Sequence, residues 1–184
     1  MCKFAPDFEI IKNMIDLSKI RTVQDFPKKG IKFYDITTVM NDPEAFRNVF
    51  DELVAHAKAM RPDVIVALEA RGYFFGPAMA LALGIPFVPI RKAGKLPYKT
   101  YRAAYHLEYG DETIEMHIDA MKQKQRVIIF DDILATGGTA AAAINLCQNF
   151  SPTFIGALFF MELEALQGRQ KLTKIDEVKS LLTV

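Results

Sequence analysis

Apolar runs alternate with longer amphipathic segments along most of the chain, and this alternation predicts strands and helices that follow one another. The clearest helix spans 42–60, because Asp42 can cap it, Pro43 takes its first position, and apolar residues recur on one face. The expected strands are 64–68, 87–90, 127–130 and 154–161, and the other expected helices are 77–83 and 139–149. Continuous apolar strands separated by helices are typical of a parallel sheet covered on both faces, so we expect an α/β fold.

The pattern changes between the second and third of these strands. Ile114, Met116 and Ile118 alternate with polar residues, which predicts a strand with one solvent-exposed face. The turn 109–112 joins this strand to 104–108 as a β-hairpin. The segment 91–102 before it is basic, contains glycine and proline, and has few apolar residues. We expect this segment to be a mobile surface loop without apolar anchors.

Composition narrows the class of protein. A chain of 184 residues with no repeat, low-complexity tract or linker fits one domain, here with a small amino-terminal elaboration. Its 51% hydrophobic and 24% charged residues exclude a chain that is disordered throughout. The net charge of +1 excludes a protein whose main work is to neutralise a nucleic-acid backbone, so any anion-binding site must be local.

Cysteine usage and hydropathy bear on location. Cys2 and Cys147 lie far apart without metal-ligand spacing, which favours a reducing cytoplasm over a disulfide framework or a structural zinc site. The uncharged stretch 72–90 is long enough to raise the question of a membrane helix. Five helix-breaking residues divide it into a short helix and a strand: Gly76, Pro77, Gly84, Pro86 and Pro89. We expect a cytoplasmic protein that does not insert into a membrane.

The strongest chemical signal follows the strand at 127–130. This strand leads into Asp131 and Asp132, and the loop 135–139 then supplies glycines, hydroxyls and a new helix amino terminus. Ligands of parallel α/β sheets bind beyond the carboxyl ends of the strands, and such a loop suits a phosphate group. The two carboxylates would repel a phosphate, so they need sugar hydroxyls or a magnesium ion as partners. The alternative is a solvent-facing acidic turn followed by an ordinary helix cap.

Other nucleotide motifs do not occur in the sequence. The chain has neither the GxxxxGK[ST] lysine of nucleoside triphosphate sites nor the GxGxxG of dinucleotide sites. The pattern at 127–139 resembles instead the phosphoribosyl pyrophosphate signature of the type I phosphoribosyltransferases. Further segments resemble the adenine phosphoribosyltransferases within that family, in the same order along the chain: 26–37, 69–73, 91–97 with GKLP, 107–110 with LEYG, and 162–169. The resemblance extends from Ile20 to the carboxyl terminus.

The resemblance implies residues for the sugar diphosphate. Asp131 and Asp132 would bind the ribose hydroxyls. The 5-phosphate would be held by Ala135, Thr136, Gly137, Gly138 and Thr139. The pyrophosphate loop would consist of Glu69, Ala70, Arg71 and Gly72, with Arg71 near the leaving group. Cations of the mobile loop, namely Arg91, Lys92 and Lys95, would bind pyrophosphate when the loop closes, or would form a solvated patch.

The resemblance also implies residues for the base and for proton transfer. Phe33 would be the platform on which adenine stacks, with Lys32 and Tyr34 beside it, whereas without the resemblance Phe33 reads as a core residue of an edge strand. The family usually has a basic residue where this chain has Tyr34, which puts a side-chain contact to the purine in question there. Glu108 would be the general acid/base together with Arg71 as catalytic residues, and Tyr109 would be a lid aromatic.

Taken as a whole, the resemblance implies a Rossmann-like type I phosphoribosyltransferase domain over 1–184. A base-binding hood would occupy about 1–40, and a flexible hairpin lid about 91–119. The implied activity transfers the phosphoribosyl group from phosphoribosyl pyrophosphate to adenine, giving AMP and pyrophosphate in purine salvage. We expect Mg²⁺ bound mainly through substrate, with no direct side-chain ligands, and a homodimer. The alternatives are transfer to a 6-oxopurine, such as hypoxanthine, guanine or xanthine, and a non-catalytic sensor of phosphoribosyl pyrophosphate.

Overall fold

The computed structural model describes residues 17–107 and 110–184, and the chain divides into two compact units, one up to Glu52 and one from Leu53 to Val184. The first unit contains an antiparallel pair of strands, β1 (Arg21–Gln24) and β2 (Lys32–Asp35). A short 3-10 helix, η1 (Leu17–Lys19), precedes the pair, and the helix α2 (Thr37–Met40) follows it. The pairing places Val23 opposite Phe33. This unit overlaps the predicted hood, and its boundary falls later than the expected residue 40.

The helix α3 (Pro43–Met60) begins in the first unit and ends in the second. Asp42 caps it as predicted, because its Oδ1 accepts hydrogen bonds from the backbone N–H of Glu44 at 3.0 Å and of Ala45 at 3.1 Å. These bonds satisfy two of the amides that a helix start leaves unpaired. The predicted helix at 42–60 is therefore confirmed with its first residue at Pro43.

The second unit is built on a seven-stranded sheet with the order β5-β6-β4-β3-β7-β8-β9. Its strands are β3 (Val64–Leu68), β4 (Phe87–Lys92), β5 (Thr100–Leu107), β6 (Gly110–His117), β7 (Arg126–Leu134), β8 (Thr153–Glu162) and β9 (Val178–Thr183). The run from β4 to β9 pairs in parallel, and β6 and β5 extend it antiparallel at one edge. The predicted α/β fold with a mostly parallel sheet is confirmed.

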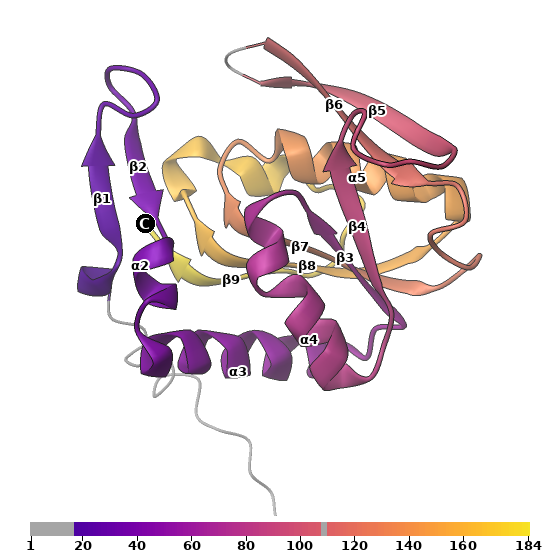
Figure 1. Cartoon of the computed structure of the whole chain (residues 1–184), viewed down its shortest axis with the longest axis horizontal. Helices are drawn as coiled ribbons and strands as arrows, with labels where there is room; N and C mark the ends of the chain where they lie inside the picture. Colours follow the sequence, from indigo (N-terminus) through magenta and orange to yellow (C-terminus); the bar gives the residue numbers. More distant parts are fainter. Residues whose placement is uncertain (1–16, 108–109) are drawn as a thin grey trace, which may run out of the picture. The chain divides into compact units, whose positions relative to one another are not determined.

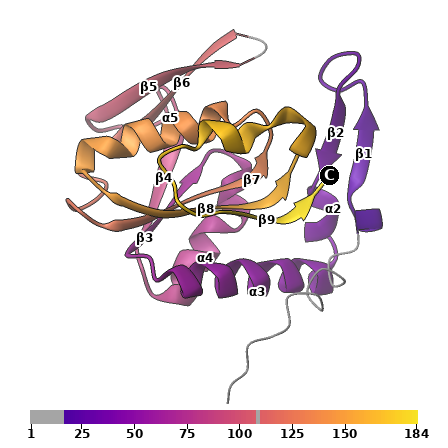
Figure 2. The ribbon, with the colours of Figure 1, turned by 180° about the vertical axis from the view of Figure 1, so that it is seen from behind.

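Helices cover both faces of this sheet. Figures 1 and 2 show α4 (Gly76–Leu83) and α5 (Gly138–Cys147) on opposite sides of it. Shorter 3-10 turns are η2 (Arg71–Phe74), η3 (Gln148–Phe150), η4 (Glu164–Leu166) and η5 (Gly168–Lys171). Gly76 lets α4 approach β3 closely, since a Cβ there would lie 2.8 Å from the Cβ of Ala67. The strand β3 is buried from end to end, and Val127 to Phe130 of β7 are buried as well, which explains the uninterrupted apolar sequence of these two stretches.

The strands β7 and β9 differ most from the prediction. The strand β7 continues to Leu134, so Asp131 and Asp132 lie within it instead of after it. Its pairing with β3 ends at Phe130, but its pairing with β8 continues through Asp131 and Leu134. The strand β9 was not predicted, because its sequence mixes polar and apolar residues at the edge of the sheet.

The expectation that 91–102 lacks anchors is wrong. Arg91 and Lys92 belong to β4, and β5 begins at Thr100, so the connecting loop is only 93–99. Tyr101, Ala103 and Tyr105 of β5 pack against the buried core of the second unit. The aromatic ring of Tyr101 meets that of Phe150 edge to face, with 5.7 Å between centroids. These three residues occupy every second position of β5, and basic residues nearby hide this alternation in the sequence.

The uncharged stretch 72–90 forms η2, α4 and most of β4. Among the helices of residues 17–107 and 110–184, none has both the length and the apolar content that a bilayer crossing requires.

Candidate active site

Asp131 and Asp132 lie near the carboxyl end of β7, in the middle of the sheet. Asp131 Oδ1 accepts a hydrogen bond from the backbone N–H of Asp132 at 2.9 Å. Asp132 is buried, and Arg71 Nε lies 2.8 Å from its Oδ2. Among the described residues, Asp132 Oδ2 takes part in this ion pair but accepts no hydrogen bond. The pair thus presents oxygens that a hydroxyl or a cation can satisfy.

Burial raises the pKa of both carboxyl groups. For Asp131 the loss of hydration is the largest cause, and the neighbouring carboxylate of Asp132 adds to it. For Asp132 burial again comes first, and the Arg71 guanidinium opposes it by lowering the pKa. One buried and one partly buried carboxyl side by side, both with raised pKa values, are costly to keep ionised without a ligand and are therefore typical of functional sites.

The segment from Glu69 to Gly72 lies beside this pair. It connects β3 to α4, and η2 begins at Arg71. The Glu69–Ala70 peptide bond is cis. A Cβ at Gly72 would lie 3.2 Å from Asp131 Oδ1 and 3.3 Å from the carbonyl oxygen of Phe130. A side chain at position 72 would crowd this contact, and glycine lets the predicted pyrophosphate loop lie next to the predicted ribose carboxylates.

The predicted 5-phosphate loop forms the turn from β7 into α5. Ala135, Thr136 and Gly137 make the turn, and Gly138 and Thr139 are already the first residues of α5. Gly137 is the residue before the helix and has a left-handed backbone with φ of 73°, which favours glycine. Burial raises the pKa of Tyr105 on β5, and the nearby side chain of Thr139 opposes this increase. The turn therefore offers the amino terminus of a ten-residue helix, whose unpaired N–H groups suit an anion.

The carboxylate of Glu69, a residue of the predicted pyrophosphate loop, is bound by one cation and one backbone amide of the same unit. Arg91 donates to both oxygens, from Nε to Oε2 at 3.1 Å and from Nη2 to Oε1 at 3.3 Å. The backbone N–H of Lys92 also donates to Oε2, at 3.0 Å. The ion pair with Arg91 lowers the pKa of Glu69 against the opposing effect of burial. Two predicted site segments, Glu69 to Gly72 and Arg91 to Lys92, are thereby joined.

The sequence reading missed Glu115. Its position in an alternating strand predicted a solvent-facing side chain, but the residue is fully buried. Its Oε1 accepts the backbone N–H groups of Lys95 and Leu96, each at 3.0 Å, and Arg102 Nε lies 3.2 Å from its Oε2. The loop 93–99 folds over this carboxylate, and a local hydrophobic pattern carries no signal of such a covering loop.

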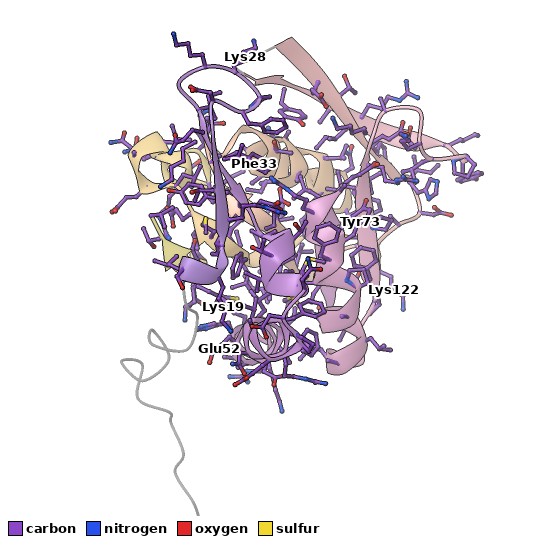
Figure 3. The ribbon with its side chains drawn as sticks, turned by 60° about the vertical axis from the view of Figure 1, so that its left-hand side comes forward. Lys19, Lys28, Phe33, Glu52, Tyr73 and Lys122 are labelled. Atoms are coloured by element: carbon purple, nitrogen blue, oxygen red, sulfur yellow. The ribbon has the colours of Figure 1, made fainter. Side chains whose placement is uncertain are left out.

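The residues predicted to contact the base are only partly described. Phe33 is on β2 in the first unit, where Figure 3 labels it, and its ring meets that of Phe26 edge to face at 5.1 Å. Lys32 Nζ lies 5.0 Å from the centroid of the Tyr34 ring, a cation–π contact between two residues of the predicted base site. Glu108 and Tyr109 lie outside the described residues, so their predicted roles stay predictions.

The next feature of the site is the set of side chains that could hold a metal ion. Within residues 17–107 and 110–184, no group of three or more His, Cys, Asp or Glu side chains is placed to hold a metal ion. Asp131 and Asp132 supply the two carboxylates at the site. Magnesium is commonly bound by one or two carboxylates together with substrate phosphates, so this pair fits an ion that arrives with the substrate.

Comparisons with known proteins agree on one family. The phosphoribosyl transferase domain model matches residues 43–182. The chain is 51% identical over 156 residues to an adenine phosphoribosyltransferase of Acetivibrio thermocellus, covering 84% of this chain and 91% of that protein. The crystal structure of the enzyme of that name from Thermoanaerobacter pseudethanolicus superposes with a TM-score of 0.87 at 44% identity, covering 96% of this chain and 99% of the other. The enzyme from Saccharomyces cerevisiae, solved with adenine and an imino-altritol bisphosphate, also gives 0.87, at 38% identity and 94% and 99% coverage. This chain therefore belongs to the adenine phosphoribosyltransferases of the phosphoribosyl transferase domain family.

Proposed function

We propose that the carboxyl ends of β3 and β7 bind phosphoribosyl pyrophosphate for the reaction of this family, in which the phosphoribosyl group passes to adenine and gives AMP and pyrophosphate. The observation that carries the proposal is the adjacency of three features. The partly buried Asp131 lies in contact with Gly72, the buried Asp132 faces Arg71 at 2.8 Å, and the amino terminus of α5 follows within a few residues. The carboxylates suit the ribose hydroxyls, Arg71 suits the diphosphate, and the amino terminus of α5 suits the 5-phosphate.

In this assignment, Asp131 and Asp132 accept hydrogen bonds from the ribose hydroxyls. The acceptor oxygen of Asp132 Oδ2 is buried and lacks a hydrogen bond within the described part of the chain, so a hydroxyl donor removes an existing cost. The turn from Ala135 to Thr139 holds the 5-phosphate with backbone N–H groups and threonine hydroxyls. Sugar and phosphate are thereby fixed by one strand and the helix that follows it.

The leaving pyrophosphate is assigned to Ala70, Arg71 and Gly72 with the cations of 91–95. Arg71 supplies positive charge near the breaking bond. Because Glu69 would repel a diphosphate but binds Arg91 through both oxygens, we assign Glu69 to orienting Arg91. Lys92 and Lys95 complete the positive charge on this side. Magnesium, held mainly by oxygens of the diphosphate, would neutralise further charge on the leaving group.

Bond changes follow from this arrangement. A ring nitrogen of adenine attacks the anomeric carbon, the bond from that carbon to the diphosphate oxygen breaks, and its electron pair leaves with pyrophosphate. The sugar passes through a state with oxocarbenium character, which the nearby carboxylates stabilise. Glu108 is assigned to take the proton from the attacking nitrogen. Closure of the hairpin, with Tyr109 as the proposed lid aromatic, would exclude water as a competing nucleophile.

The base site is assigned to the first unit. Phe33 is the proposed stacking platform, with Lys32 and Tyr34 beside it. Because the ammonium of Lys32 covers the ring of Tyr34, this pair is assigned to shaping the site, and main-chain carbonyls are left to accept from the 6-amino group of adenine. The names of the relatives favour adenine over the 6-oxopurines that the sequence reading left open.

Assembly and location are proposed on separate grounds. The exposed face of α4 carries Leu81, which is 83% exposed, in a stretch without charged side chains. An apolar helix face of this kind suits burial against a second copy, so we propose a homodimer, to be tested by light scattering. Cys147 is a free buried thiol, and burial raises its pKa to about 12. An inert thiol fits the reducing cytoplasm that we propose as the location.

The assay for the proposed activity uses purified protein, phosphoribosyl pyrophosphate, magnesium and each nucleobase in turn, with pyrophosphate release as the readout. We expect release with adenine and far slower release with hypoxanthine, guanine or xanthine. Equal release with a 6-oxopurine would overturn the assignment to adenine, and no release with any base would overturn the enzyme assignment.

A further inference from the structure

The segment that follows β8 packs against the proposed 5-phosphate loop, backbone to backbone. A Cβ at Gly168 would lie 2.1 Å from the carbonyl oxygen of Ala135 and 2.8 Å from the backbone nitrogen of Gly137. From the other side, a Cβ at Gly137 would lie 2.2 Å from the carbonyl oxygen of Gly168. Neither position has room for any other residue, so Gly168 forms one wall of the turn that must present its N–H groups to a phosphate.

The neighbour of Gly168 fixes this wall to the sheet. Arg169 Nε donates to Glu162 Oε1 at 3.0 Å, and Arg169 Nη2 donates to Glu162 Oε2. The third nitrogen, Nη1, donates to the carbonyl oxygen of Val178 on β9. Ser180 Oγ donates to Glu162 Oε2 at 2.9 Å. A fork-shaped guanidinium with every nitrogen used holds the turn η5 in one orientation, which a flexible lysine could not do.

Glu162 stands beside the end of the strand that leads into the phosphate loop. It is the register partner of Leu134, the last residue of β7, and its side chain is nearly buried. The backbone N–H of Leu163 donates to the carbonyl oxygen of Leu134 at 2.9 Å. The backbone at 162–163 is therefore bound to the end of β7, and the Glu162 carboxylate is bound to Arg169 of η5, so the two ends that flank the loop 135–137 are both attached to the end of β8.

We propose that Gly168, Arg169 and Glu162 are positioning residues for the 5-phosphate, which set the backbone of Ala135 to Gly137 without touching the substrate themselves. This inference rests on the assignment of 135–139 to the 5-phosphate. It gives a role to the segment 162–169, which resembles the family but has no role in the proposed site. If the inference is correct, substitutions of these three residues weaken binding of the sugar phosphate and leave binding of pyrophosphate unchanged.

The test is calorimetric titration of ribose 5-phosphate and, separately, of pyrophosphate with magnesium. The variants are Gly168→Ala, Arg169→Gln and Arg169→Lys, at a temperature where all are folded. We expect Kd for ribose 5-phosphate to rise by about tenfold or more in Gly168→Ala and Arg169→Gln, the loss expected when a charged hydrogen bond is weakened. Arg169→Lys keeps the charge but not the fork, so its Kd should lie between those of the wild type and Arg169→Gln. Kd for pyrophosphate should be unchanged in all three.

A matched glycine control separates positioning from stability. Gly84 ends α4 with φ of 67°, and nothing lies within 4 Å of a Cβ built there. Gly84→Ala should lower the melting temperature and leave Kd for ribose 5-phosphate unchanged.

If Gly168→Ala and both Arg169 variants lower the melting temperature but bind ribose 5-phosphate as the wild type does, the segment is only structural and the inference is overturned. If the wild type itself does not bind ribose 5-phosphate, the assignment of the 5-phosphate loop fails first. If Gly168→Ala does not fold, the two Arg169 variants decide the question.

Discussion

The two ends of the proposed phosphoribosyl pyrophosphate site are built in different ways. The 5-phosphate end, 135–139, is fixed by backbone packing, because Gly137 and Gly168 leave no room for a side chain between them. The diphosphate end, 69–72 with 91–99, is held by ion pairs such as Arg91 to Glu69 and by the carboxylate of Glu115. Packed backbone has one arrangement, whereas ion pairs can exchange one anion for another. The comparison implies a preformed site for the 5-phosphate, which remains on the product, and an adjustable site for the pyrophosphate, which leaves.

The largest effect is expected from a matched pair of glycine substitutions. Gly137 and Gly94 both have left-handed backbones, with φ of 73° and 82°. That conformation costs a residue with a Cβ roughly 1–2 kcal/mol at either position. Only Gly137→Ala also meets a neighbour, so we expect it to lower affinity for phosphoribosyl pyrophosphate by about 100-fold or more. Gly94→Ala should change affinity by no more than about threefold. Equal losses of affinity in the two variants, measured by titration calorimetry, would contradict the proposed difference between the two ends.

The next effect concerns the ribose carboxylates. Replacing Asp132 by Asn should cost on the order of 1.5–3 kcal/mol of phosphoribosyl pyrophosphate binding, the size of a charged hydrogen bond. The fold should survive, because Asn has the same shape. The exposed Asp119→Asn on the same unit serves as the control for loss of one charge and should bind as the wild type does. Unchanged affinity of Asp132→Asn would return the pair to the alternative of an acidic turn without a ligand.

A smaller effect is expected from Glu115→Gln. The amide keeps one acceptor oxygen but loses the charge that pairs with Arg102 and strengthens the bonds to Lys95 and Leu96. We expect trypsin to cleave at Lys95 and Lys99 several times faster, and KM for pyrophosphate in the reverse reaction to rise by about threefold to tenfold. KM for AMP should not change. A variant with wild-type cleavage and KM would show that the loop 93–99 is held by other contacts.

The smallest effect is a gain in stability with a defined pH dependence. Because burial and Asp132 raise the pKa of Asp131 in the folded chain, ionisation of this group destabilises the fold at neutral pH. Asp131→Asn should therefore raise the melting temperature at pH 7.5 by about 2–4 °C, which corresponds to roughly 1 kcal/mol in a chain of this length. The gain should shrink as the pH falls toward the ordinary pKa of aspartate, where the carboxyl is protonated in both states. The exposed Asp176→Asn is the control for loss of one charge and should leave the melting temperature at pH 7.5 unchanged. A gain for Asp131→Asn that grows on acidification would contradict the assignment.

The sequence predicted those elements that are determined by residues next to one another in the chain, such as an apolar run or a helix cap. The strand Val64–Leu68 matched its apolar run residue for residue, and the cap at Asp42 was read correctly from the residue types. The edge strand β9 and the extension of β7 to Leu134 were not predicted, because both depend on pairing with β8.

In the candidate site, too, some residues could be predicted from local motifs and others could not. Motif resemblance singled out Asp131, Asp132 and the loop 135–139, and the structure brings them together with Arg71 and Gly72. It did not single out Glu115, whose burial depends on a loop twenty residues earlier in the chain, nor the contact between Gly137 and Gly168. Interactions between residues distant in sequence decide these features, and no local period or residue spacing records them.

Hydrogen exchange measured by mass spectrometry tests the contrast between the two ends most directly. Peptides that cover 134–140 and 93–99 are compared in the free protein and with phosphoribosyl pyrophosphate and magnesium. We predict that 134–140 is already protected in the free protein and changes little on binding. Peptides over 93–99 should exchange faster in the free protein and become strongly protected when the diphosphate binds. Fast exchange of 134–140 in the free protein, with protection gained there and not at 93–99, would contradict the account.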